Sequence, residues 1–369
     1  MAQPRILIAG AGIAGLALER ALGNQGITAD VVERDSEPRT TGAGLYLPAN
    51  AVRALRRLGL GAELAERAQQ VTRQRMLDHR GRPLAQYEVR DIWGDVGDCY
   101  AITRAGLHDL LHSTGRTPVR FGLGVETADA QGTVTFTDGT QDSYDLVVGA
   151  DGIGSAVRGS AFAGATPRFL NQICWRFLAR DSTGEIRAGE WTARLGSNGR
   201  GFLTVPLGDG RVYCYADTNS ARPTPPDGDW RALFADFAGP VPALLEQGAD
   251  AYFAALEEID DTDWARPHAV LIGDAAHACS PSMAQGGAMA LEDTLVLAEL
   301  LAGAADRAAV PATVSAYRHR RVARIQWVLA QNHRRDKTRT LPAALRNFVL
   351  KRWGVHIFRA NHTELLPPP

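Results

Sequence analysis

Three glycines near the start of the chain, Gly10, Gly12 and Gly15, have the spacing G-x-G-x-x-G. A short apolar run precedes them and apolar residues at helical spacing follow, which predicts a strand, a tight turn and a helix. In such a unit the first glycine allows the turn, the second lets the backbone approach a pyrophosphate, and the third lets the helix pack on the strand. The helix N-terminus favours a bound anion. The motif therefore predicts a dinucleotide site.

Acidic residues at the ends of predicted strands extend this site. Glu33 ends the next predicted strand about twenty residues further on, where a carboxylate hydrogen-bonds ribose hydroxyls. This pattern alone suits FAD and NAD equally. Three further segments favour FAD: Gly149-Ala150-Asp151-Gly152, the segment Gly273-Asp274-Ala275-Ala276-His277 that continues through Pro281 to Gly286-Gly287, and Arg104 at a predicted helix start.

The order of these segments resembles the class A FAD-dependent monooxygenases, the family of para-hydroxybenzoate hydroxylase and related aromatic hydroxylases. The motifs run GAGIAG, Glu33-Arg34, GAGLYLPANAVRAL, TRAGL, GADGIGSAVR and GDAAHACSPSMAQGGAMALED, and the resemblance spans residues 1 to about 330. Ala278 stands where many relatives have proline, and Cys279 is uncommon there. These departures concern the pocket more than the cofactor.

The resemblance implies an α/β fold with a Rossmann-like FAD-binding domain, a second mixed β-sheet domain that binds substrate, and C-terminal helices. It implies that His277 has a structural role beside the FAD loop and that Asp151 orders its own segment. The positions it implies for FAD binding are Gly10, Gly12, Ala14, Gly15, Glu33, Arg34, Ala43, Arg104, Asp151, Asp274, Pro281, Gly286 and Gly287.

The resemblance also implies the reaction, in which FAD reduced by NADH or NADPH reacts with O2 and the resulting flavin C4a-hydroperoxide hydroxylates a small aromatic molecule. The protein must exclude water and hold the substrate. Because an ionised phenol is attacked more readily, a cation or base beside the substrate would help. Candidates are Arg176, Arg194, Tyr213 and Tyr215 on the second sheet, and Tyr46 in the GAGLYLP segment. Tyr213 and Tyr215 share one face of a strand.

The nicotinamide nucleotide is expected to bind only in passing, since the chain contains one G-x-G-x-x-G motif. The expected FAD-binding domain is discontinuous, because segments of the sheet domain interrupt it. The arginine-rich C-terminal tail could cover the active site or form a dimer contact. The expected boundaries are 1–74, 101–165 and 266–330 for the FAD domain, 75–100 and 166–265 for the sheet domain, and 331–369 for the helical tail.

Composition and charge are those of an ordinary globular protein, with 45% hydrophobic residues, 22% charged residues and a net charge of -1. Neither a nucleic acid nor a membrane surface is expected as a partner. The four cysteines lie far apart without a CxxC pair, which argues against a metal site or disulfides and fits the cytoplasm. No signal peptide or membrane span is expected. The expected partner is a small-molecule substrate, and the chain is expected to be a monomer or a homodimer.

Other functions share this type of FAD domain. A flavin-dependent halogenase is excluded, because the chain has no W-x-W segment and both lysines lie near the C-terminus. A non-oxygenating FAD-dependent reductase or dehydrogenase stays open, as does epoxidation or Baeyer–Villiger oxygenation within the same family. A flavin-binding redox sensor without turnover is a further alternative. Oxygen incorporation and substrate-stimulated NAD(P)H oxidation distinguish these possibilities.

Overall fold

A computed structural model describes residues 3–38, 43–162, 165–304 and 306–369. Gly42, which begins the GAGLYLP segment, lies outside these residues. The chain starts with β1 (Ile6–Ala9), α1 (Ile13–Asn24) and β2 (Asp30–Glu33), and β1 pairs with β2 in parallel. This is the βαβ unit that the glycine spacing predicts.

A six-stranded sheet, counted over the described residues, grows from this unit in the order β18-β19-β12-β1-β2-β8. Strands β1 and β12 are buried along their whole length, as expected for parallel strands covered on both faces. On one side α1 packs against α9, the apolar helix Gly286–Ala302. The remaining strands are β8 (Val119–Phe121), β12 (Leu146–Gly149), β18 (Ala265–Arg266) and β19 (Ala269–Leu271).

Smaller elements complete this half of the molecule. A sheet in the order β3-β7-β4 consists of β3 (Gly44–Leu47), β7 (Cys99–Thr103) and β4 (Gln69–Val71). A second sheet consists of β9 (Val125–Ala128), β10 (Thr133–Phe136) and β11 (Gln141–Ser143). The other helices of this half are α2 (Ala49–Arg57), α3 (Gly61–Arg67), α5 (Arg104–Ser113), α6 (Ala156–Ala161) and α8 (Asp274–His277), whereas α4 (Val89–Trp93) packs beside the larger sheet on β6.

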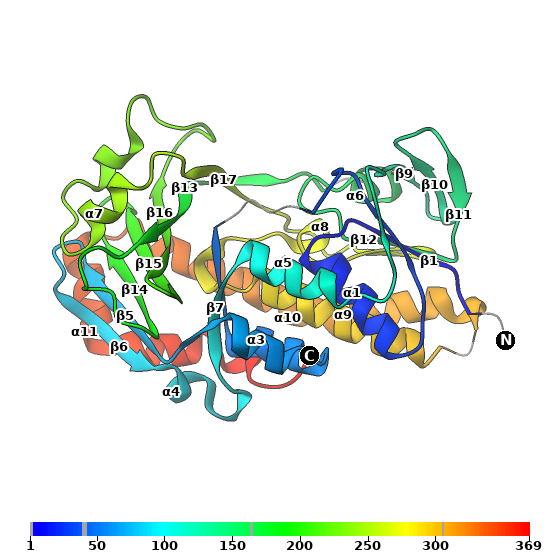
Figure 1. The fold of residues 1–369 in the computed structure, drawn as a ribbon, viewed down its shortest axis with the longest axis horizontal. Helices are drawn as coiled ribbons and strands as arrows, with labels where there is room; N and C mark the ends of the chain where they lie inside the picture. The colour runs from blue at the N-terminus through cyan, green and yellow to red at the C-terminus, as the bar shows by residue number, and fades with distance from the viewer. Residues whose placement is uncertain (1–2, 39–42, 163–164, 305) are drawn as a thin grey trace.

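A larger sheet of seven strands, again counted over the described residues, lies at the other end of the molecule in the order β17-β13-β16-β15-β14-β5-β6. Its outer face is covered by an aromatic core under α7 (Val241–Glu246), and its inner face looks toward the first half (Figure 1). Its strands are β5 (Arg73–Asp78), β6 (Pro83–Glu88), β13 (Arg168–Arg180), β14 (Glu190–Leu195), β15 (Gly201–Gly208), β16 (Arg211–Asn219) and β17 (Tyr252–Glu258).

Two long C-terminal helices connect the halves. Helix α10 (Val310–Thr338) is about 44 Å long and runs lengthwise along the molecule, and α11 (Ala343–Ala360) lies beneath β5 and β6 (Figure 1). The expected start of the tail at 331 falls inside the continuous helix α10. The break comes instead before Pro342, because proline disfavours helical backbone at the residue that precedes it.

The expected boundaries of the sheet domain also differ by a few residues from the strands. Strand β5 begins at Arg73 rather than 75, and the boundary at 100 cuts through β7, which pairs with β3 and β4. Across the described parts of the chain, no helix is both long enough and apolar enough to span a membrane.

Candidate active site

A cavity of about 1690 Å³ lies between the carboxyl ends of the parallel strands and the inner face of the seven-stranded sheet. In open α/β sheets, ligands bind at these strand ends. Most of the predicted FAD positions line the cavity, whereas Ala14 and Gly15 are not among its lining residues. Those that line it are Gly10, Gly12, Glu33, Arg34, Ala43, Arg104, Asp151, Asp274, Pro281, Gly286 and Gly287.

The three glycines of the motif have three different surroundings. Gly10 has φ +104°, and a Cβ there would lie 2.6 Å from the carbonyl oxygen of Ala150. A Cβ on Gly15 would lie 1.9 Å from the carbonyl oxygen of Gly10, so this glycine lets α1 pack on the turn. A Cβ on Gly12 would meet no described atom within 4 Å. The open space at Gly12 suits a diphosphate at the start of α1, a helix that, as far as the structure is described, has no side-chain cap.

Glu33 holds the turn from the second strand. Its carboxylate accepts hydrogen bonds from the N–H groups of Ala11 at 2.8 Å and Asp35 at 3.0 Å. His108 on α5 also lines the cavity, and its Nε2 lies 2.9 Å from the carbonyl oxygen of Ala11. Burial lowers the pKa of His108, so the neutral ring donates this bond. The glycine motif gave no indication of His108, which comes from a separate segment.

Asp151 orders the neighbouring turn. One carboxylate oxygen accepts hydrogen bonds from the N–H groups of Ala156 at 2.8 Å and Val157 at 3.2 Å, at the start of α6. The other oxygen is buried and has no hydrogen-bond partner among the described residues. Burial raises the pKa of Asp151. An unpaired carboxylate oxygen at the cavity wall is suited to a polar group of a bound cofactor.

Asp274 is exposed to the cavity at the start of α8, and a buried network holds its loop from behind. His277, only 2% exposed, lies with its Nε2 2.7 Å from a carboxylate oxygen of Asp293. The same oxygen accepts the N–H of Gly273 at 2.9 Å. Burial raises the pKa of Asp293, but the combined effects of His277 and Arg321 are larger, so the pKa lies below its ordinary value. His277 is not among the cavity-lining residues, and its position suits the structural role that the resemblance implied.

Arg321 on α10 completes this network. It is 0% exposed, and its Nε donates to Asp293 at 2.7 Å while an Nη donates to Glu292 at 3.0 Å. Glu292 also accepts from Asn50 at 3.1 Å, and Asn50 donates to Gln285 at 2.9 Å, immediately before Gly286-Gly287. Sequence reasoning missed Arg321 and Asn50. The available signal was the adjacent acidic pair on an apolar helix, because buried carboxylates require cationic or hydrogen-bonding partners.

The five substrate candidates all line the same cavity: Arg176, Arg194, Tyr213, Tyr215 and Tyr46. The guanidinium carbon of Arg176 lies 5.6 Å from the ring centroid of Tyr215. The Nε of Arg176 is buried and, within the described residues, has no hydrogen-bond partner. Burial raises the pKa of Tyr213 to about 12 and that of Tyr215 well above its ordinary value. The two phenols are therefore neutral near pH 7 and suit hydrogen bonding better than proton abstraction.

Tyr46 is fixed by its neighbours rather than free in the cavity. Its hydroxyl oxygen accepts from the amide of Gln74 at 2.6 Å, and Gln74 accepts from the hydroxyl of Tyr87. Arg194 has a different position from the other sheet candidates, because a Cβ on Gly239 would lie 3.0 Å from its Nη2, beside Glu185. Because successive side chains of a strand point to opposite faces, Arg194 lies on the face of β14 opposite that of Ala193.

The C-terminal helices form one wall of the cavity, a role that the sequence left open. Arg339 donates to Asp217 of β16 at 2.7 Å, and Arg346 donates to the carbonyl oxygen of Gly196 at 2.7 Å. Leu350 and Phe358 of α11 are lining residues. Helical periodicity in this segment indicates helices but not the surface they cover.

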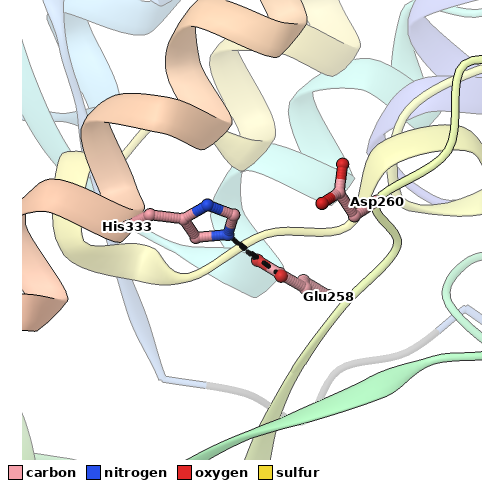
Figure 2. A group of neighbouring side chains, drawn as sticks. All are labelled: Glu258, Asp260 and His333. Atoms are coloured by element: carbon pink, nitrogen blue, oxygen red, sulfur yellow. Dashed lines mark hydrogen bonds and ion pairs between the residues drawn. The ribbon is translucent and has the colours of Figure 1, made fainter.

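Glu258, Asp260 and His333 form a cluster whose potential metal-ligand atoms lie within 4.8 Å of one another (Figure 2). The buried carboxylate of Glu258 accepts from His333 at 2.8 Å and forms an ion pair with Arg168. Arg168 and His333 already provide hydrogen-bond donors to this carboxylate. The cluster thus ties β13 and β17 to α10.

Comparisons with known proteins identify the family. Residues 3–332 match the family model described as FAD binding domain. Aurachin C monooxygenase/isomerase of Stigmatella aurantiaca is 33% identical, over 89% of this chain and 88% of that protein. The 2-heptyl-3-hydroxy-4(1H)-quinolone synthase of Pseudomonas aeruginosa is 33% identical, over 89% and 87%. The crystal structure of Klebsiella pneumoniae HpxO with FAD and uric acid has a TM-score of 0.85 and 27% identity, over 99% of this chain and 97% of that one.

The matches confirm the predicted fold class and the use of FAD. The chain belongs to the class A FAD-dependent monooxygenases, oxidoreductases that use NAD(P)H and O2.

Proposed function

We propose that this enzyme hydroxylates an aromatic or heteroaromatic ring whose oxygen substituent, a carbonyl or a phenolate, is held by Arg176. The observation that carries the proposal is the guanidinium of Arg176, which lines the FAD cavity and forms no ion pair with a carboxylate among the described residues. An oxygen of a ligand that accepts a hydrogen bond from this cation offsets part of the cost of its burial.

We propose which part of FAD each cavity-lining residue would contact. Gly10 and Gly12 with the start of α1 would hold the pyrophosphate, and Glu33 with Arg34 the adenosine ribose. Arg104, Asp151 and Asp274 would hold the ribityl chain and pyrophosphate, and Ala43 would lie close by. Pro281 and Gly286-Gly287 would line the isoalloxazine ring, where a second uncapped helix, α9, begins among the described residues. Bound FAD would accept a hydride from NAD(P)H and activate O2.

The side chains around the ring would then prepare the substrate. The positive charge of Arg176 lowers the pKa of a hydroxyl beside it and favours the electron-rich phenolate or enolate, which is attacked more readily. Tyr213 and Tyr215, neutral phenols on the same face, would orient the ring by hydrogen bonding. Helix α11 lines this side of the cavity with apolar side chains, which would help to exclude water. NADH or NADPH is proposed to bind transiently, because the sequence has one nucleotide motif.

Replacing Arg176 by methionine is expected to lower kcat/KM for substrate-stimulated NAD(P)H oxidation by about 10- to 150-fold, the value of a hydrogen bond to a charged group. The experiment screens phenols, hydroxypyridines and 4(1H)-quinolones, and detects one added oxygen atom in the product by mass spectrometry. Arg180→Met is the matched control, because Arg180 lies on the same strand but is exposed. Unchanged kcat/KM and product in Arg176→Met would refute the role of this arginine.

Replacing Asp274 by alanine is expected to reduce FAD occupancy while the fold is retained, because the side chain faces the cavity rather than the core. Loss of one charge-assisted hydrogen bond corresponds to about 10- to 150-fold weaker binding. Flavin absorbance of purified protein measures occupancy, and acid precipitation should release the flavin because binding is noncovalent. A variant with full flavin and wild-type turnover would show that Asp274 does not contact the cofactor.

A further inference from the structure

The cavity continues beyond the region that the FAD positions and Arg176 occupy. At about 1690 Å³ it exceeds the roughly 300–1,000 Å³ of an ordinary ligand pocket. It reaches under α11, where Val349, Leu350, Ile357 and Phe358 are among its lining residues. This end of the cavity belongs to no motif of the sequence.

A single cross-strand row forms the floor of the cavity. Arg176 on β13 lies opposite Tyr215 on β16, which lies opposite Leu203 on β15. The row continues through Ala193 on β14 to Met76 on β5, and all five residues line the cavity. Since neighbouring strands lie about 4.8 Å apart, the row measures about 19 Å from Arg176 to Met76. Along it the chemistry changes from a cation and a phenol to purely apolar side chains.

Close packing against β6 positions helix α11 across the apolar end of this row. A Cβ on Gly354 would lie 2.8 Å from the Cβ of Ala85, so the helix backbone contacts β6 directly. At its C-terminal end Phe358 packs with its ring centroid 5.2 Å from that of Tyr87. The space between α11 and the row is therefore bounded by elements that pack directly on one another.

Polar groups near this end are already paired. Arg346 donates to the carbonyl oxygen of Gly196, and His362 is bonded to the carbonyl oxygen of Phe358. Burial, with Arg335 nearby, lowers the pKa of His362 to about 4, so the ring is uncharged at neutral pH. On α11, β5 and β6, the described residues include no buried side-chain polar atom without a partner. The unpaired nitrogens of Arg194 on β14 belong to a side chain on the strand face opposite that of Ala193. A polar ligand group would therefore gain nothing here, whereas an apolar group would bury surface.

We propose that this apolar wing, bounded by Met76, Ala193, Leu350 and Phe358, binds an aliphatic chain attached to the ring of the substrate. The inference rests on the proposed function, which places the oxygen-bearing ring at Arg176. The substrate is then amphipathic, with a ring over Tyr215 and Leu203 and a chain that extends across β14 and β5. Two to three strand spacings correspond to a length of about 10–14 Å along the sheet surface that this chain can contact.

The test measures how strongly chain length controls binding to the FAD-loaded enzyme. The probes are 4(1H)-quinolones with a methyl, propyl, pentyl or heptyl group at position 2, and Kd is read from the perturbation of flavin absorbance. Each buried methylene is expected to strengthen binding about fourfold until the wing is full. Ala193→Phe should fill the wing from the sheet and bring the ratio of the methyl Kd to the heptyl Kd close to one. Leu350→Trp should have the same effect by filling the wing from α11. Ala344→Phe, at an exposed position of α11, should keep the wild-type ratio.

Two outcomes would overturn the apolar wing. One is a Kd in the wild-type enzyme that does not change with chain length, for the quinolones and for 4-alkylphenols alike. Failure of both series to bind counts as the same outcome. The other is a ratio that stays steep in both filling variants while they retain FAD. Product analysis of the same compounds separates this inference from the proposed function. Hydroxylation with a flat series refutes the wing alone, whereas a steep series without any oxygenated product refutes the proposed function alone.

Discussion

Replacing Arg321 by methionine should lower the free energy of unfolding by about 3–5 kcal/mol, the usual cost of removing one partner of a buried ion pair. Methionine fills much of the same volume, but Asp293 would stay buried without its arginine and keep only His277 and the N–H of Gly273 as partners. Glu292 would lose one of its cations and keep Arg324 at 2.7 Å. Urea unfolding of the FAD-free protein measures the loss. The pKa of Asp293 is lowered in the folded protein, so its contribution to stability is present above its ordinary pKa and disappears as pH falls.

Arg320→Met is the matched control for this experiment. Arg320 is the preceding residue on α10 and pairs with Glu299 at 2.7 Å, but both side chains are partly exposed. Exposed pairs contribute about 0–1 kcal/mol, so this variant should unfold nearly as the wild type does. Equal losses in the two variants would show that the buried network contributes nothing beyond an ordinary surface pair.

Gly12→Ala and Gly15→Val should affect different properties of the same motif, the first FAD binding and the second stability. The methyl group that Gly12→Ala adds would occupy space that is open in the described structure, so the protein should fold normally but bind FAD at least about 10- to 100-fold more weakly. The side chain that Gly15→Val introduces would overlap the backbone of Gly10, so this variant should lose stability even without FAD. FAD titration and thermal unfolding of both FAD-free variants measure the two effects.

Gly81→Ala offers a control of another kind, because that glycine has φ +82° and open space and is not among the residues that line the cavity. Its alanine variant should show backbone strain without a specific effect on FAD. If Gly12→Ala keeps wild-type FAD affinity, the pyrophosphate does not approach this glycine. If Gly15→Val unfolds at the wild-type temperature, the contact between α1 and the turn is more adaptable than its geometry indicates.

The sequence predicted the first half of the fold well because its information is local. An apolar strand, three spaced glycines and an apolar helix must lie next to one another, and Gly10, Gly12 and Glu33 consequently meet at one strand end. The second sheet followed from the resemblance, and the candidate Arg176 that it placed there lies inside β13. Resemblance to a family with known motif order added the identity of the cofactor.

The rest depended on contacts between distant segments. The row from Arg176 to Met76 exists because β14 pairs in parallel with β5, a strand more than a hundred residues earlier, and nothing local specifies that register. The partner of the buried pair Glu292-Asp293 lies on another helix for the same reason. Helix α11 showed its helical pattern in the sequence, but its position over the cavity follows from contacts with β6 that only the fold reveals.

The match to the FAD-binding family ends at residue 332, whereas α11 begins at Ala343. The helix that roofs the cavity therefore lies outside the part of the chain that the family model describes. Substitutions in α11 can therefore change the size and polarity of the cavity while every residue expected to hold FAD stays unchanged.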